Sequence, residues 1–357
     1  MAYEVKIKKL PKSEIELEIS LPADFLDLGR KKAIKLFSDS LDISGFRKGH
    51  IPEKIVIEKI GEDKILEEAT DIILKEHFSK IIEQEKLDII GRPNVSITKL
   101  ALGNPIEIKA TFAIIPSFEL PDYKKIAVSS QQQVVSKEKK EETEVTDKEV
   151  EDVLLQIRKN KAHFDYHKNN PEDKEHHHPE IKDTDLPELN DEFAKDAGNF
   201  KNLDELKEKV KQNIKDEKKI RDIEKKRASI IEELVKNTSI ELPDILIESE
   251  INKSLVQMKD DVERAGHKFD EYLIQVKKTE DDLKKDLKES SEKKAKVQLI
   301  FNKIAEVEKL SPNKDILENE VKEIMKHYPE ATEQNARIYV STILLNQEVL
   351  KLLENKS

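Results

Sequence analysis

The chain has 357 residues, of which 39% are charged, 36% hydrophobic and only 5% aromatic. Its 64 basic and 75 acidic residues give a net charge of −11, which argues against a protein that coats nucleic acid non-specifically. The absence of cysteine excludes disulfides, thiol catalysis and cysteine-based zinc sites. Since a single hydrophobic core rarely grows beyond about 300 residues, we expect at least two folded parts.

The first 118 residues have the pattern of a small α+β domain. Residues 3–9 and 14–20 alternate apolar and polar side chains, as paired strands do, and the alternation returns in two later segments. Apolar residues at helical spacing lie between these two pairs of strands. The predicted helices begin at Pro22, at Pro52 and at Asp63, and the later strands cover 94–100 and 106–115.

The rest of the chain changes character twice. Residues 119–144 are bounded by prolines and then rich in Gln, Lys and Glu, which predicts an extended linker. Residues 145–357 have helical periodicity, beginning with a capping-box pattern at Thr146–Glu149, and are interrupted by a polar loop at 165–185. The sequence therefore predicts an α+β protein: a small α+β head and a mostly α-helical C-terminal body with long arm helices.

The N-terminus lacks a basic stretch followed by an apolar one, and no run approaches the roughly 18 apolar residues of a membrane span. We therefore expect a cytoplasmic protein without a membrane partner.

No motif for catalysis or cofactor binding stands out. The sequence has no glycine-rich phosphate loop, no nucleophile elbow and no His-Glu-x-x-His, so we expect no catalytic residue and no cofactor. His176–His178, with His163 and His167 upstream, could bind a metal ion. Because the surrounding composition is that of an exposed polar loop, the sequence favours the absence of a metal site there.

The segment from Gly45 to Pro52 is the most distinctive feature. Two glycines permit a turn that other residues resist, and they enclose Phe46, Arg47 and Lys48. An arginine–lysine pair beside an exposed aromatic suits an RNA backbone together with an apolar protein pocket. An ordinary turn between helices, with Phe46 tucked into its own domain, explains the residues equally well at this point.

The segment reads Gly45-Phe46-Arg47-Lys48-Gly49-His50-Ile51-Pro52 and resembles the signature loop of the trigger factor family, the bacterial ribosome-associated chaperones. That family's pattern is Gly-Phe-Arg-x-Gly-Lys-x-Pro, so His50 stands where a lysine is usual. Residues 145–150, 186–193 and 240–243 resemble later segments of the same family. The resemblance implies that these eight loop residues form a ribosome-binding site.

The resemblance further implies an ATP-independent holdase at the ribosomal exit tunnel. Its partners would be the large ribosomal subunit, through a ribosomal protein and rRNA, and unfolded nascent polypeptides, with a weak homodimer off the ribosome. Family members usually carry an FKBP-type prolyl isomerase domain, yet only 21 residues, 165–185, separate Phe164 from Leu186. Because a domain needs about 50 residues or more, we expect no isomerase activity.

Two alternatives stay open from the sequence. A holdase or assembly chaperone that works without ribosomes is favoured by His50 and by the acidic balance. A prolyl isomerase with an unrecognised site is disfavoured, because no aromatic residue lies between Tyr166 and Phe193 to build an isomerase pocket.

Overall fold

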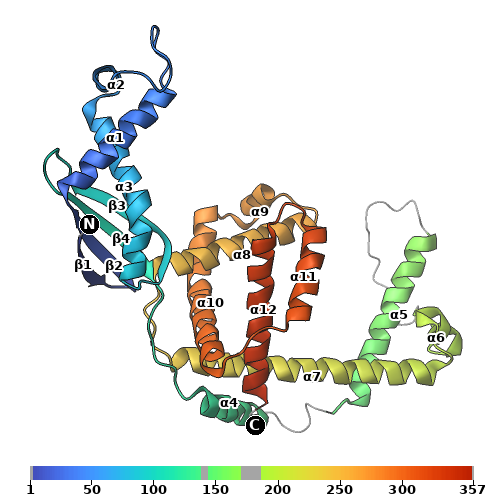
Figure 1. Cartoon of the computed structure of the whole chain (residues 1–357). Coiled ribbons are helices and arrows are strands. Elements are labelled where there is room, and N and C mark those ends of the chain that lie inside the picture. Colours follow the sequence, from blue (N-terminus) through green and yellow to red (C-terminus); the bar gives the residue numbers. More distant parts are fainter. Residues whose placement is uncertain (1–2, 138–143, 170–185, 356–357) are drawn as a thin grey trace. The chain divides into compact units, whose positions relative to one another are not determined.

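The computed structural model describes residues 3–137, 144–169 and 186–355 (Figure 1). By its internal contacts the chain divides into two units, one of Met1–Leu120 with Thr238–Asn302 and one of Pro121–Asn237 with Lys303–Ser357. Because each unit combines two separate stretches of the chain, the domain boundaries predicted at residues 118 and 144 stay predictions.

The first unit begins with a four-stranded antiparallel sheet in the order β1-β2-β4-β3. The strands are β1 (Glu4–Leu10), β2 (Glu14–Leu21), β3 (Ile89–Lys99) and β4 (Ile106–Ile114). Along β2 every second side chain is buried, and Leu17 lies opposite Ala110 of β4 in the same core. The apolar–polar alternation of the sequence therefore corresponds to the two faces of this sheet.

Three helices complete this part of the first unit, namely α1 (Ala23–Ser40), α2 (Glu53–Ile60) and α3 (Glu62–Gln84). The backbones of α1 and α3 approach closely at Gly29, where a Cβ atom would lie 2.8 Å from the carbonyl oxygen of Ala69. From α3, Phe78 meets Phe112 of β4 edge to face, with 6.1 Å between ring centroids. Helices and sheet thus share one hydrophobic core.

The same unit contains α8 (Asp244–Arg264), α9 (Phe269–Val276) and most of α10 (Glu280–Glu308). Their narrow apolar stripes meet in a second core, whose buried members are Leu242, Ile247, Ile251, Leu255, Leu283 and Ala295. Stripes of this width bury one face and leave the remainder of each helix in solvent.

The second unit is helical. It contains α4 (Tyr123–Lys137), α5 (Asp147–Asn169), α6 (Asp191–Gly198), α7 (Leu203–Lys236), α11 (Lys314–His327) and α12 (Glu333–Glu354). Helix α7 has 34 residues and contacts α4, α5, α6 and α12 along its length. Near its start, one core joins α5, α6 and α7 through Leu154, Phe193, Ala194, Leu206, Val210 and Ile214.

Two expectations need correction. The extended linker predicted at 119–144 contains helix α4, because Tyr123, Ala127 and Ser130 recur at helical spacing and are buried. Residues 165–169, predicted as the start of a polar loop, are the last residues of α5, and residues 170–185 lie outside the described residues. His176–His178 lie outside the described residues. The predicted α+β class itself is confirmed.

Candidate functional site

The candidate docking loop, residues 45–52, connects α1 to α2 and has a backbone that requires its two glycines. Gly45 and Gly49 have φ angles of 90° and 81°, in the region that favours glycine. The N–H of Gly49 donates a 2.9 Å hydrogen bond to the carbonyl oxygen of Ser38 at the end of α1. A Cβ atom on Gly49 would lie 2.5 Å from the Oδ1 atom of Asp39, so the Asp39 side chain would have to move to make room for a larger residue.

The loop side chains divide into an exposed tip and a buried anchor. Phe46 is 39% exposed, and Arg47, Lys48 and His50 are also exposed. In contrast, Ile51 is only 6% exposed and belongs to the core of the head, while its N–H donates to the Oγ atom of Ser38 at 3.1 Å. Ile51, one of the eight residues predicted to form the ribosome-binding site, is therefore a core residue that holds the loop against α1.

The charges at the tip are accessible. The Nζ atom of Lys48 lies 3.8 Å from a carboxylate oxygen of Asp42, but both side chains are exposed and such a pair is weak. Within the described part of the chain, no carboxylate lies at ion-pair distance from Arg47. The tip therefore presents one aromatic ring and two basic groups to solvent.

Arg30 of α1 positions the helix that follows the loop, a role that no pattern in the sequence signals. Its guanidinium lies 2.6 Å from a carboxylate oxygen of Glu53 at the start of α2 and 2.5 Å from one of Glu62 at the start of α3. Hydrogen bonding to Glu62 raises the pKa of Arg30, and the same bond lowers the pKa of Glu62. The three helices are thus joined at one end of the loop.

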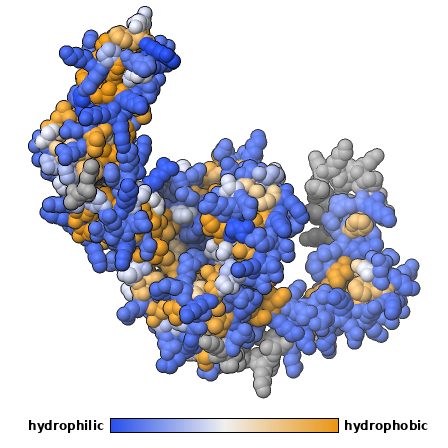
Figure 2. Space-filling model, in the orientation of Figure 1, coloured by the Kyte–Doolittle hydropathy of each residue, from blue (hydrophilic) through white to orange (hydrophobic). Residues whose placement is uncertain are grey.

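Both units also leave large apolar side chains exposed on their helices. Figure 2 shows hydrophobic residues at the surface, interspersed among hydrophilic ones. We use the name exposed apolar surface for those on six of the helices: Ile220 and Ile223 on α7, Val256 on α8, Ile274 on α9, Val307 on α10, Ile316 on α11, and Ile338, Tyr339 and Ile343 on α12. On α7, α10 and α11, therefore, some of the apolar residues that recur at helical spacing in the sequence are buried in the core and others are exposed.

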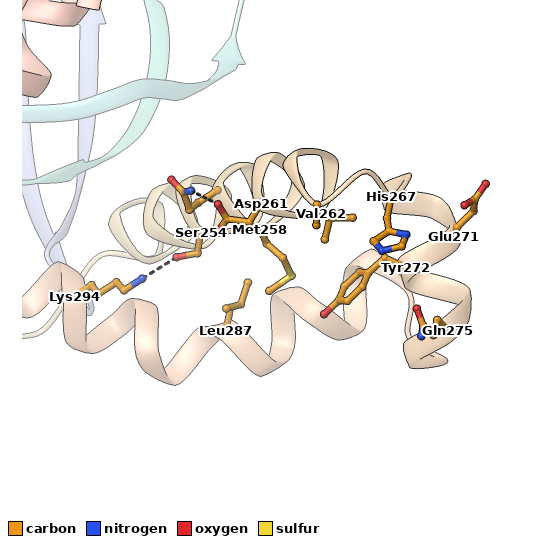
Figure 3. Close-up of a pocket in the computed structure, with 12 residues that line it drawn as sticks. Ser254, Met258, Asp261, Val262, His267, Glu271, Tyr272, Gln275, Leu287 and Lys294 are labelled. Carbon is orange, nitrogen blue, oxygen red and sulfur yellow. Dashed lines mark hydrogen bonds between the residues drawn. The ribbon is translucent and has the colours of Figure 1, made fainter. Parts of the chain in front are cut away.

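A pocket of about 670 Å³ lies between α8, α9 and α10 (Figure 3). Met258 of α8 and Leu287 of α10 point toward one another across it, and Val262 and Tyr272 add further apolar surface. Its rim is polar, with Lys294 donating to the Oγ atom of Ser254 at 3.1 Å. A flexible methionine in an apolar hollow can adapt to side chains of different shape.

Neither a metal cluster nor a membrane span is found in the described parts of the chain. Among those residues, no group of three or more His, Cys, Asp or Glu side chains is placed to hold a metal ion. None of the helices that these residues form combines the length and apolar character that a membrane crossing needs.

The chain is an α+β protein with two kinds of surface suited to binding other macromolecules. One is the exposed, glycine-bounded loop of the small head with the antiparallel sheet, and the other is the set of apolar side chains that the helices leave exposed. Two models of one family match the chain. The "Bacterial trigger factor protein (TF)" model matches residues 3–157, and its "C-terminus" model matches residues 202–355. The chain therefore belongs to the trigger factor family.

Individual relatives agree with this assignment. Trigger factor of Caldicellulosiruptor bescii is 26% identical over 432 aligned residues, which cover 99% of this chain and 96% of the relative. Trigger factor of Clostridium kluyveri is 23% identical, and the alignment covers 99% of this chain and 99% of the relative. A solved structure described as "Promiscuous Substrate Recognition in Folding and Assembly Activities of the Trigger Factor Chaperone" has the same fold, with a TM-score of 0.56, 19% identity, and coverage of 99% of this chain and 100% of the other.

Proposed function

We propose that the chain is an ATP-independent chaperone that binds the ribosome and holds unfolded nascent polypeptides at the exit tunnel. The exposed tip of Phe46, Arg47 and Lys48 between two glycines is the observation on which this proposal rests. Membership of the trigger factor family supports the proposal, and so does the similarity to a solved structure that is described as a trigger factor chaperone. The cytoplasm is the compartment in which such a role is exercised.

The docking loop would meet two kinds of surface on the large ribosomal subunit. Arg47 and Lys48 carry the charge that neutralises rRNA phosphates, and Phe46 would fill an apolar pocket on a ribosomal protein. Two phosphate contacts give a shallow salt dependence, with a log–log slope of about −1.5. His50 adds to the positive charge only when it is protonated, unlike the lysine that is usual at this position.

Polypeptide holding would use the exposed apolar surface and the pocket between α8, α9 and α10. Unfolded chains expose apolar side chains before they can bury them, and weak contacts with separate apolar residues tolerate many sequences. None of these contacts needs nucleotide. We further propose that the chain lacks isomerase activity and forms a weak homodimer when it is not on a ribosome.

Sedimentation with purified bacterial ribosomes tests the docking step. The variant Phe46→Ala, Arg47→Ala, Lys48→Ala should lose ribosome binding. A matched control replaces the exposed residues Lys219, Ile220 and Arg221 of α7 with alanine, which removes one apolar and two basic side chains elsewhere. Binding by the control should equal that of the unmodified chain. Unchanged binding by the loop variant would eliminate the loop as the docking site.

The holding step is tested separately, by suppression of the aggregation of a denatured model protein without nucleotide. The loop variant should keep this activity. Replacing Ile338 and Tyr339 with serine should weaken it, because 59% and 62% of these side chains are exposed. Serine at Gln334 and Gln347 of the same helix is the matched control. If the chain suppressed aggregation but never sedimented with ribosomes, the ribosome-independent holdase would be the correct function.

A further inference from the structure

Two histidines on α5 converge, although the sequence alone favoured no metal site. His163 and His167 are four residues apart, so they lie on the same face of the helix, one turn from each other. Their Nε2 atoms are 3.3 Å apart, and the ring planes meet at 71° with 4.5 Å between centroids. Both side chains are half-buried.

This separation matches the geometry of a shared zinc ion. Zinc binds imidazole nitrogen at about 2.0–2.1 Å and prefers tetrahedral coordination, which places two ligand nitrogens roughly 3.3–3.4 Å apart. Two histidines at this spacing on a helix are a known arrangement for binding zinc. For both Nε2 atoms to bind a metal ion through their lone pairs, the proton of each neutral ring must lie on Nδ1.

The surroundings hold this part of α5 in position and include carboxylates. Arg158 donates from Nε to the carbonyl oxygen of Pro187 at 2.7 Å, which fixes the helix one turn earlier. Lys161 lies 3.2 Å from a carboxylate oxygen of Asp165 and 3.6 Å from one of Asp196 on α6. Two carboxylates thus offset the charge of Lys161 in this part of α5.

We propose that His163 and His167 form a two-histidine site for a divalent transition metal on α5, with zinc as the ion that the geometry fits best. Two histidine ligands alone bind zinc more weakly than a four-ligand structural site does, and imidazole nitrogens bind copper more tightly than zinc. Phe164 stands where the His-Glu-x-x-His motif has its glutamate, so the site lacks that catalytic base.

Isothermal titration with Zn²⁺, and separately with Cu²⁺, tests the proposal on the full chain. The reference protein carries His176→Asn, His177→Asn and His178→Asn, so that this run contributes no ligands. It should bind one Zn²⁺ per chain. His163→Ala or His167→Ala should weaken binding about tenfold or more, since loss of even an indirect ligand contact costs that much. Zn²⁺ should also slow hydrogen exchange of the amides in residues 163–169, because the ion joins successive turns.

A spacing control separates a defined site from general histidine affinity. His167→Gln combined with Lys168→His keeps the number of histidines but rotates one of them by about 100° around the helix. This variant should bind Zn²⁺ as weakly as His167→Ala. Equal affinity of the spacing control and the reference protein, or no binding by the reference protein, would overturn the proposal.

Discussion

Phe46 and Ile51 lie in the same loop but have opposite surroundings. The ring of Phe46 is partly in solvent, whereas Ile51 is buried in the core that the head's helices and sheet share. Both residues belong to the motif that resembles the family signature. We therefore expect Ile51 to contribute mainly to folding stability and Phe46 mainly to binding.

Alanine substitution at these two positions should have different effects on stability. Ile51→Ala should lower the free energy of unfolding of the head by about 2–5 kcal/mol, because it leaves a cavity in the core. Phe46→Ala should lower it by less than about 1 kcal/mol, because the ring leaves no enclosed cavity. Hydrogen exchange of peptides from residues 3–118, followed through a denaturant series, measures both. Similar losses for the two variants would mean that Phe46 is a core residue.

The sequence predicted the loop but not the direction of each side chain. Two glycines and a proline marked where the chain turns, since their backbone preferences are local. The path of the loop also includes hydrogen bonds from residues 49 and 51 to Ser38, which belongs to the preceding helix. No spacing rule connects those positions, so the tucked and exposed arrangements could not be separated before the structure was known.

At the scale of elements, one carboxylate joins the start of α5 to the middle of α7. The backbone N–H of Thr146 donates to Glu149 at 2.9 Å, and the N–H of Glu149 donates to the hydroxyl of Thr146 at 3.3 Å, which is the capping box that the sequence predicted. Lys218 of α7 lies 2.8 Å from the same carboxylate. Hydrogen bonding to Lys218, followed by that to the Thr146 backbone, lowers the pKa of Glu149 to about 2.

This carboxylate should make the contact between α5 and α7 sensitive to acid. Because the folded pKa of about 2 lies below the ordinary value of 4.5, the ionised form stabilises the fold above pH 4.5. The contribution should disappear as the pH falls from about 4.5 to about 2. Glu149→Gln should therefore lower the melting temperature at neutral pH, and its difference from the unmodified chain should shrink across that range.

Glu151→Gln is the matched control, since Glu151 is exposed on the same helix and one turn or less from Glu149. Its melting temperature should follow that of the unmodified chain at every pH. A constant difference between Glu149→Gln and the unmodified chain down to pH 2 would show that the carboxylate's ionisation does not stabilise the contact.

Long helices could be predicted from sequence because their apolar spacing repeats over several turns, as in α7 and α10. Helices α4 and α9 were not predicted. The glutamines of α4 obscure its helical spacing in the sequence. The helix also packs against α7 and α12, which lie far away in the chain, and Gln131 donates a hydrogen bond to the carbonyl oxygen of Leu353. Helix α9 has eight residues, as α2 does, but α2 follows Pro52, whereas α9 follows Lys268, which does not cap it with its side chain.

At the scale of the whole molecule, little room remains for a further domain. The two family models leave 44 residues, 158–201, between them. The end of α5 and all of α6 occupy much of this stretch. The alignment with the Caldicellulosiruptor bescii relative covers 432 residues against the 357 of this chain, so at least 75 aligned positions have no counterpart here. That many positions are enough for a domain that folds independently, which supports the proposal that this chain lacks isomerase activity.

The full chain should therefore show no prolyl isomerase activity. In a protease-coupled assay on a proline-containing peptide, the cis-to-trans rate should stay at the uncatalysed value, with a time constant of tens to hundreds of seconds at 25 °C. A known FKBP-type isomerase serves as the positive control, and a heat-denatured sample of this chain serves as the blank. Suppression of client aggregation by the same preparation would show that the protein is active. A rate that rises in proportion to the concentration of the chain would mean that a catalytic pocket exists outside the domain that relatives use.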